Sequence, residues 1–337
     1  MTDKMNKFLE RPINNLPSAL YRRLALKSIR ITDSELSGVT FKVAETLEEH
    51  ELSFRLVHDM YVARGISKKD PSGIRFSAFH VLPTTTTFIA KRDDRVIGTV
   101  SLIEDSPIGL PMEKTHPEEI LSLRLDSRRF AEVGALAVEK GHRGRGVSLM
   151  LYNILFRWAR QHRFIESLVI AVHPGIAKFY EDVLLFQRIG PTRYYESLNK
   201  ALSTPLLLEL SSATTRFRAI YEHHSMRLGK APCGNLYSFF SEHEFPSILL
   251  PESVPFSPRI HCAPEWREQD LLRFIETYGV DVASLPRQHQ RVLMEFYPSL
   301  KTLTRHRHSG ARHGAADRRH AGTADAGTTR RPIHAGT

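Results

Sequence analysis

The sequence predicts an α/β protein of the layered α+β kind, in which helices flank a mixed, twisted sheet. Two observations predict it. Between residues 39 and 210, segments of strand length alternate with segments of helical periodicity. A basic, glycine-rich turn also joins one of these strands to an amphipathic helix. The order strand, loop, helix, strand, helix, strand is that of a sheet covered by helices.

The first half of this region reads as a helix followed by a hairpin. Apolar side chains recur at helical spacing from Leu52 to Tyr61, and Gly65 ends the pattern. Two strands are expected next, Thr84 to Lys91 and Val96 to Ile103, with a charged turn between them. The following loop carries Pro107, Gly109 and Pro111, and a polar stretch leads from it to Arg129.

The second half begins with a short apolar strand from Ala131 to Val138, followed by the basic turn at residues 140–146. One face of the next segment is apolar from Val147 to Trp158, which is typical of an amphipathic helix. A strand at 168–172 and a helix at 176–184 follow, and 193–195 and 206–210 are expected to close the sheet.

These patterns divide the chain into four parts. Residues 1–38 form a polar N-terminal lead-in, and 39–210 form the core. Residues 211–300 form an appended C-terminal helical region whose role is not legible, with one helix around Leu271 to Tyr278 ended by Gly279. Residues 301–337 form a basic tail of His, Arg, Gly, Ala and Thr, which is expected to be disordered because it has few apolar side chains to bury.

Composition excludes several classes of protein. The 337 residues are 41% hydrophobic and 25% charged, as in ordinary globular proteins. The polar opening stretch and the lack of a long apolar run predict a cytoplasmic protein without a membrane span. Cys233 and Cys262 show no disulfide framework and no zinc-ligand spacing, so no metal site is expected.

The net charge of +10 does not indicate that this chain binds nucleic acid. Eight Lys and Arg residues against two Asp residues lie in the tail, so most of the excess charge falls there. The tail also lacks aromatic side chains that could stack on bases. No nucleic-acid partner is therefore expected.

The turn Arg143-Gly144-Arg145-Gly146-Val147-Ser148 is the segment that carries chemistry. Glycines let the backbone approach a ligand closely, and the free N–H groups at a helix start bind phosphate. Two arginines add charge-assisted contacts. Neither a Walker loop nor a dinucleotide fingerprint fits the spacing. Taken alone, such glycines would more often serve a structural turn than a ligand.

The flanking segments make this turn resemble the phosphate loop of the GNAT superfamily of acyltransferases. The resemblance rests on the strand from Ala131 to Val138, the turn, and a later helix that carries Phe179-Tyr180 and ends at Phe186. Ser148 stands where the family has Gly or Ala, and Leu185 stands where it has the Gly of a Leu-Gly-Phe ending.

A narrower resemblance covers roughly residues 54 to 210. The sequences Pro83-Thr84-Thr85-Thr86-Thr87-Phe88, Gly109-Leu110-Pro111-Met112 and His173-Pro174, with Ala131-Glu132-Val133, are similar to the long-chain N-acyl amino acid synthases. That family implies transfer of a fatty acyl group from acyl carrier protein to the nitrogen of an amino acid. The Gly-Leu-Pro-Met loop is its most specific element.

The superfamily resemblance implies roles for individual residues. The donor's pantetheine arm would pair with the strand at Leu136 and Val138, and its phosphate would rest on Arg143, Gly144, Arg145, Gly146, Val147 and Ser148. No tightly bound cofactor is implied, only acyl-phosphopantetheine or acyl-CoA as cosubstrate.

Glu132 is the candidate general base, or the group that orients the incoming amine, because a carboxylate in an apolar strand has a raised pKa. Tyr180 is the candidate general acid, at the position where a phenol reaches the leaving thiolate. Each residue has a plainer alternative: Glu132 could pair with a buried arginine or face solvent, and Tyr180 could be core. His173 could replace either residue but more often such a histidine caps a helix. Arg157, Arg160 and Arg163 could dock an acidic carrier protein or form an ordinary solvated face.

We therefore expect an N-acyltransferase that moves a medium or long acyl chain from acyl carrier protein to an amino acid. An acetyl-CoA-dependent acetyltransferase is the first alternative. A protein of the same fold that binds an acyl thioester without turnover is the second.

Overall fold

The computed structural model describes residues 15–28, 36–195, 199–222, 227–228, 231–232, 236–241 and 266–301. The expected disordered tail lies outside these residues, apart from Lys301, and so do both cysteines. None of the helices in the described part of the chain is long and apolar enough to cross a membrane.

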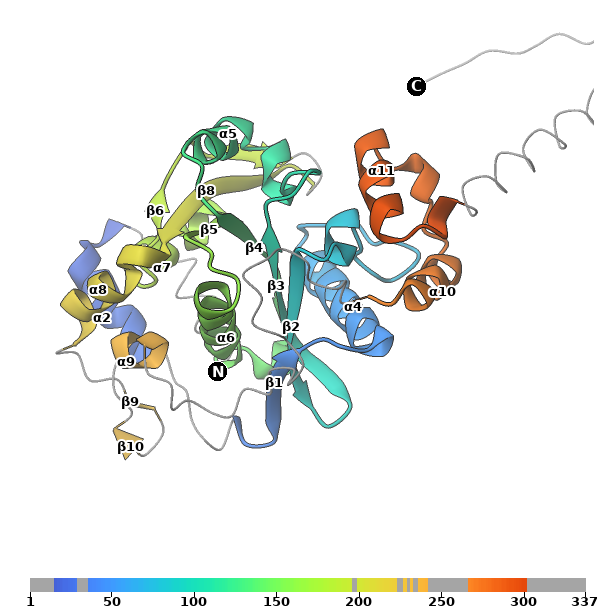
Figure 1. Cartoon of the computed structure of the whole chain (residues 1–337). Coiled ribbons are helices and arrows are strands. Elements are labelled where there is room, and N and C mark those ends of the chain that lie inside the picture. The colour runs from blue at the N-terminus through green and yellow to red at the C-terminus, as the bar shows by residue number, and fades with distance from the viewer. Residues whose placement is uncertain are drawn as a thin grey trace, which may run out of the picture.

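A mixed, eight-stranded sheet forms the centre of the molecule, as the sequence predicts (Figure 1). Its hydrogen-bonded order is β1-β2-β3-β4-β5-β8-β6, with β7 also paired to β8. All these pairings are antiparallel except β4 with β5. The strands are β1 (Val39–Val43), β2 (Thr85–Arg92), β3 (Arg95–Glu104), β4 (Phe130–Val138), β5 (Ser167–Val172), β6 (Gln187–Arg188), β7 (Arg193–Tyr195) and β8 (Ala201–Glu209). A separate two-stranded sheet pairs β9 (Arg227–Leu228) with β10 (Ala231–Pro232).

Strands β4 and β5 separate soon after they begin to pair. Their parallel register covers only Phe130 to Glu132 on β4. On the other side of β4, Ala135 and Leu136 stand opposite Val100 alone, so β4 carries a bulge. Ala135 takes a left-handed backbone conformation there, with φ at 52°. From residue 133 on, β4 therefore has no paired strand on its β5 side within the described residues.

The bulge also changes which side chains of β4 face which side of the sheet, because strand side chains alternate. Before it, Ala131 and Val133 join the core that contains α6, while Glu132 points to the opposite face. After it, Val138 joins the α6 core and Ala137 packs with α4.

Helices cover both faces of the sheet. On one face lie α6 (Val147–Gln161), α7 (Pro174–Asp182), α2 (Ser18–Ser28), α8 (Leu210–Tyr221) and α9 (Leu236–Ser241). On the other face lie α4 (Leu47–Ala63), α10 (Glu268–Tyr278) and α11 (Arg287–Phe296). The short helix α5 (Pro117–Leu125) and the 3-10 turns η2 (Ala78–Val81), η3 (Pro111–Lys114), η4 (Lys140–His142) and η6 (Val282–Ser284) complete the described elements.

The predicted elements of the core are confirmed to within a few residues at their ends. Strand β8 is longer than expected and begins at Ala201. Elements that the sequence did not predict include β1, β6, α5 and α2. Helix α2 lies in the polar lead-in, yet Tyr21 and Ala25 are fully buried from it in the main core.

The appended region after residue 211 packs on both faces of the sheet rather than standing apart (Figure 1). Helices α8 and α9 extend the core around α6, where Phe217 and Phe240 lie 5.3 Å apart at their ring centroids. Helices α10 and α11 extend the opposite core. Trp266 stacks on Phe54 of α4 at 6.0 Å with an interplanar angle of 5°, and the Tyr297 hydroxyl donates to the Val81 carbonyl at 2.6 Å.

Helix α6 packs closely on β3 because Gly98 has no side chain. A Cβ built at Gly98 would lie 2.8 Å from Val147 Cγ1 and 3.1 Å from Leu151 Cδ1. Both contacts are shorter than van der Waals packing allows. Gly98 therefore sets how near the first turn of α6 can come to the sheet.

Gly98→Ala should push this first turn outward and destabilise the protein by about 1–3 kcal/mol, the usual cost of overpacking a core. Urea unfolding followed by circular dichroism measures the change. Gly141→Ala is the matched control, since nothing lies within 4 Å of a Cβ there. Equal stability of the two variants would contradict the close packing.

Candidate active site

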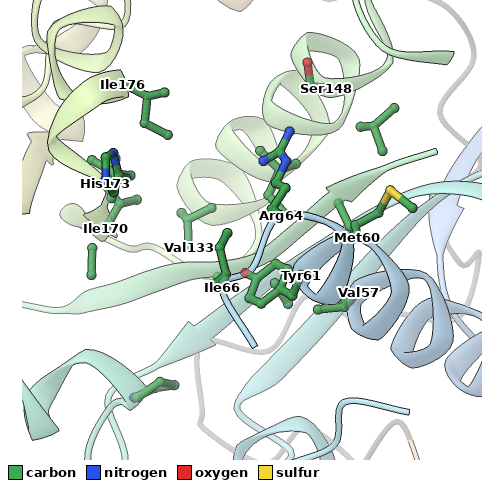
Figure 2. A pocket seen from close by; sticks show the side chains of 18 of the residues that line it. Val57, Met60, Tyr61, Arg64, Ile66, Val133, Ser148, Ile170, His173 and Ile176 are labelled. Carbon is green, nitrogen blue, oxygen red and sulfur yellow. The ribbon is translucent and has the colours of Figure 1, made fainter. Parts of the chain in front are cut away.

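A cavity of about 930 Å³ lies where β4 and β5 separate. Residues from both faces of the sheet line it: Ile103 and Phe79 come from the α4 side, and Leu149 and Tyr180 come from the α6 side. Figure 2 shows Tyr61 and Arg64 of the α4 end on one side, with Ile170, His173 and Ile176 across from them. The cavity thus connects the two faces through the gap between the strands.

Glu132 lies at the closed end of this gap, on the α4 face. Its side chain is only 6% exposed, and burial raises its pKa to about 8. One oxygen, Oε2, accepts a hydrogen bond from the Met112 N–H at 2.8 Å, which opposes the rise. The described residues offer it no arginine partner. The glutamate is therefore neither ion-paired nor turned to solvent, the two plainer alternatives.

Among the described residues the other oxygen of Glu132, Oε1, has no hydrogen-bond partner, and the residue lines the cavity. A Cβ built on Gly134 would stand 3.9 Å from Oε1, so the absence of a side chain at this position leaves that oxygen approachable. A carboxylate with one anchored and one open oxygen, at a pKa near neutral pH, fits a general base.

The Gly109-Leu110-Pro111-Met112 loop is what holds Glu132. Arg124 of α5 clamps the loop by pairing with Asp105 at 2.7 Å and with Glu113 at 2.5 Å. Gly109 takes φ at 75°, and a Cβ there would collide with the Glu113 carboxylate. The clamp thus fixes the position from which the Met112 N–H reaches Glu132.

The expected phosphate loop lies at the other end of the cavity, at the start of α6. Gly144 and Gly146 both have positive φ, at 72° and 90°, and Gly146 is the N-cap of α6 without any side-chain cap. The first N–H groups of a helix have no partner within it, and the helix dipole makes this end positive. Ser148 lines the cavity beside this loop (Figure 2).

The remaining residues expected to hold the donor divide into three groups. Leu136 and Val138 line the cavity along the unpaired edge of β4. Arg143 also lines it, but its side chain turns back to the strand and donates from Nε to the Val138 carbonyl at 3.0 Å. Arg145 and Val147 contribute no lining, and Val147 is buried in the core against Gly98.

Tyr180 lies across the gap from Glu132, on the α6 face. Its hydroxyl and that of Tyr152 are 2.6 Å apart, and both residues line the cavity. Burial raises the pKa of Tyr180 above its ordinary value. The phenol therefore keeps its proton at neutral pH, as a general acid must. It is also 7% exposed and packed in the core, which is its plainer interpretation, while its role as general acid stays a prediction.

His173 is the N-cap of α7. Its Nδ1 accepts the Gly175 N–H at 3.1 Å, which is the capping role that was the plainer expectation. The side chain is exposed and borders the cavity. No group of His, Cys, Asp and Glu in the described part of the chain could hold a metal ion.

Two of the three arginines near the end of α6 form polar contacts within the fold. Arg163 pairs with Glu104, and Arg160 donates to the Thr214 hydroxyl at 2.6 Å. Arg157 is half-buried. All three lie at or beyond the last turns of α6, whereas the phosphate loop lies at its start. Arg160 is exposed, as on an ordinary solvated face, and a docking role for the three arginines stays a prediction.

Leu185 occupies the position at which the superfamily has glycine. Its left-handed backbone conformation explains why glycine is usual there. Its φ is 60°, in the left-handed region that costs a residue with a Cβ roughly 1–2 kcal/mol. The side chain is 3% exposed and packs in the main core. Apolar burial of a leucine, worth about 1.5–3 kcal/mol, offsets the strain.

Sequence reasoning missed several residues of the site, among them Tyr152, whose hydroxyl bonds to Tyr180. Tyr61 and Arg64 come from the end of α4, Arg75 from the loop before η2, and Tyr195 from the end of β7. The Tyr195 hydroxyl donates to the Pro111 carbonyl at 2.7 Å, beside the Met112 N–H that binds Glu132. Only the position of Arg64 next to the helix-ending Gly65 could have suggested a site in advance.

Known proteins match the core of the chain. Residues 53–208, a little under half of the chain, match the family model for N-acyl amino acid synthase FeeM. Among solved structures, FeeM from uncultured soil microbes is 25% identical with a TM-score of 0.48, covering 52% of this chain and 93% of its own. A search of curated proteins finds no match.

Two other solved structures are more distant. An acyl-CoA N-acyltransferase from Pseudomonas aeruginosa is 12% identical with a TM-score of 0.35, covering 50% of this chain and 98% of its own. The CoA-dependent acyl-homoserine lactone synthase BjaI is 15% identical with a TM-score of 0.40, covering 60% and 98%. The family match and the sheet with its open β4 edge identify the core of this chain as an acyltransferase domain of the GNAT fold that resembles the N-acyl amino acid synthases.

Proposed function

We propose that this N-acyltransferase moves a medium or long acyl chain from acyl carrier protein to the amine of an amino acid. One observation carries the proposal: Glu132 lies buried at the closed end of a gap that has the start of α6 at its other end. The gap gives a thioester arm a route from the phosphate loop to a base.

The open edge of β4 supports the placement of the donor. An extended arm with amide groups can add to an unpaired strand edge by backbone hydrogen bonds. Leu136 and Val138 offer such an edge on the side that β5 leaves free. The thioester of an arm bound there would lie between Glu132 and Tyr180.

The chemistry follows from these positions. The amine nitrogen attacks the thioester carbonyl carbon, and its proton goes to Glu132 Oε1. The C–S bond then breaks, and the thiolate takes the phenolic proton of Tyr180. Tyr152, bonded to Tyr180, can replace that proton. Holding both reactants in the gap supplies much of the rate, because the reaction becomes effectively unimolecular.

The donor end carries positive charge. Arg64 is exposed at the end of α4, Lys140 precedes the phosphate loop and Arg145 lies within it. An acidic carrier protein would be steered to such an entrance. A cavity of about 930 Å³ also lies within the range of sites for drug-sized ligands, which exceeds what an acetyl group requires.

The purified full chain should therefore turn over an acyl carrier protein thioester with a higher kcat/KM than the CoA thioester of the same acyl chain. Mass spectrometry should find a product with the mass of the amino acid plus the free fatty acid, less one water. The Glu132→Gln variant is the control without catalysis. Turnover of acetyl-CoA alone would indicate an acetyltransferase, and thioester binding without turnover would indicate a binding protein; either result excludes the proposal.

Glu132→Gln should lower kcat/KM by about 10²-fold or more, since general base catalysis contributes 10²–10⁴-fold. The amide keeps an oxygen for the Met112 N–H, so the fold should persist. Because only the deprotonated carboxylate accepts a proton, the wild-type rate should rise with pH and level off above about pH 8, and the variant should lack this limb.

Acceptors whose amines differ in pKa separate the ionisation of the amine from that of Glu132. Only the part of the pH profile that reports the amine shifts when the acceptor changes. Glu181→Gln is the matched control, because Glu181 pairs with Arg188 on the surface at 3.1 Å. Identical pH profiles for wild type and Glu132→Gln would remove Glu132 as the base.

Tyr180→Phe should lower kcat only about 2- to 10-fold, because a thiol of pKa near 8.5 leaves fairly well unaided. The loss should shrink with donors whose thiol has a lower pKa. Tyr194→Phe is the control, since Tyr194 is 65% exposed and outside the cavity. A loss that is independent of the thiol pKa would indicate a packing role for Tyr180.

A further inference from the structure

The cavity holds several fixed cations around one carboxylate. Arg64 and Arg143 lie towards the start of α6, and they are near enough to each other that Arg64 helps to lower the pKa of Arg143. Arg75 and Lys114 lie on the α4 face, with Glu132. The first pair lies at the proposed donor end, where the Arg143 Nε already donates to the Val138 carbonyl. Nothing in the proposed chemistry uses the second pair.

Arg75 is held rigidly in this wall. Its backbone N–H donates to the Phe54 carbonyl at 3.1 Å, and its guanidinium lies 5.2 Å from the centroid of the Tyr61 ring. The side chain also donates to the Ser67 hydroxyl at 3.4 Å. Among the described residues it forms no ion pair with a carboxylate. A half-buried guanidinium in a cavity, fixed on an aromatic ring without a counter-ion, suits an anionic group of a ligand.

Two tyrosines place Arg75 relative to Glu132. Tyr61 and Tyr195 line the cavity, and Tyr195 bonds to the loop that holds Glu132. The pKa of each phenol is raised by the Glu132 charge and lowered by the Arg75 charge, in addition to the effect of burial. Arg75 contacts the Tyr61 ring, the Tyr195 hydroxyl bonds to the loop that holds Glu132, and all four residues line the same cavity.

The other titratable groups beside Arg75 carry no compensating charge. His80 is buried, and burial with the nearby Arg75 lowers its pKa to about 4, so it is neutral at physiological pH. Lys114 is exposed at the rim. Apart from Glu132, the charges on the acceptor side are thus positive. This positive charge repels a polycationic acceptor such as a polyamine.

We propose that Arg75 binds the α-carboxylate of the acceptor and so selects amino acids over amines that lack this group. The amine nitrogen of such an acceptor reaches Glu132 while its carboxylate meets the guanidinium, and Tyr61 and Tyr195 border the space between. The inference rests on the proposed function for the identity of the acceptor class, and it makes Arg75 a specificity-determining residue.

The test compares an amino acid with its amide, which lacks the carboxylate, as acceptors for the full chain. Arg75→Gln should lower kcat/KM for the amino acid about 10- to 100-fold, mainly through KM, because one charge-assisted contact is lost. The value for the amide should stay within about 2-fold of wild type. Arg75→Lys should restore part of the preference, since it keeps the charge without the planar fork.

Two controls make the outcome decisive. Arg55→Gln changes an exposed arginine of α4 and should leave the preference intact. Lys114→Gln tests the other cation of this face. Unchanged discrimination in Arg75→Gln, or its collapse in Lys114→Gln instead, would overturn the assignment.

A binding measurement separates this inference from the proposed function. Isothermal titration with N-dodecanoyl amino acids and their methyl esters should show tighter binding of the free acids to wild type, and no such difference in Arg75→Gln. Selective binding without turnover would leave Arg75 as the carboxylate site and refute the enzyme's proposed reaction. If Arg75→Gln turned over amino acids with the same preference as wild type, the proposed reaction would stand and the role of Arg75 would be refuted.

Discussion

The separation of β4 from β5 is the constraint on which the rest of this structure depends. Two strands that pair over only three residues leave backbone groups of β4 without a strand partner, and unpaired groups at such an edge need water or a ligand. The bulge at Ala135 and Leu136 shifts the alternation of the β4 side chains by one residue, so that Glu132 faces the α4 side before it and Val138 faces the α6 side after it. Each chemical group of the site takes its position from this geometry.

Electrostatics then divides the site into two ends. Glycines at the start of α6 and the arginines near them make the donor end positive, while Glu132 is held in an apolar wall by a single backbone N–H. Burial alone would make a carboxyl group hard to ionise, and the Met112 N–H moderates that effect. The Asp105, Glu113 and Arg124 clamp therefore acts on the glutamate through the loop, without contact with any reacting atom.

Much of this arrangement could be predicted from the sequence, and the reasons are local. The turn from Arg143 to Ser148 joins a strand to an amphipathic helix, and both periodicities are strong enough to read without tertiary information. Glu132 stands out because a carboxylate interrupts an apolar strand. These signals predicted the fold. They also identified Glu132, Tyr180 and the phosphate loop, which line one cavity in the structure.

What could not be predicted depends on contacts between distant segments. Arg75 and Tyr195 are ordinary in their local sequence, and only the folded sheet sets them around Glu132. The Gly-Leu-Pro-Met loop suggested the identity of the carrier, whereas its contacts are with the glutamate. Arg143 was expected to face the phosphate, but its Nε donates to Val138. Helix α2 was not predicted because its sequence is polar overall. Its Tyr21 is buried in the folded protein, where it contacts Lys178 of α7.

The short seam between β4 and β5 has a mechanical consequence. Strands β1 to β4 form one half of the sheet and strands β5 to β8 form the other, and antiparallel pairing holds each half together. Within the described sheet the two halves, or plates, pair through three residue pairs only. A small rotation about that seam would widen or narrow the gap without breaking either ladder. A substrate that touches both plates resists such a rotation, so the width of the gap, and with it the distance between base and acid, is set partly by the molecule bound there.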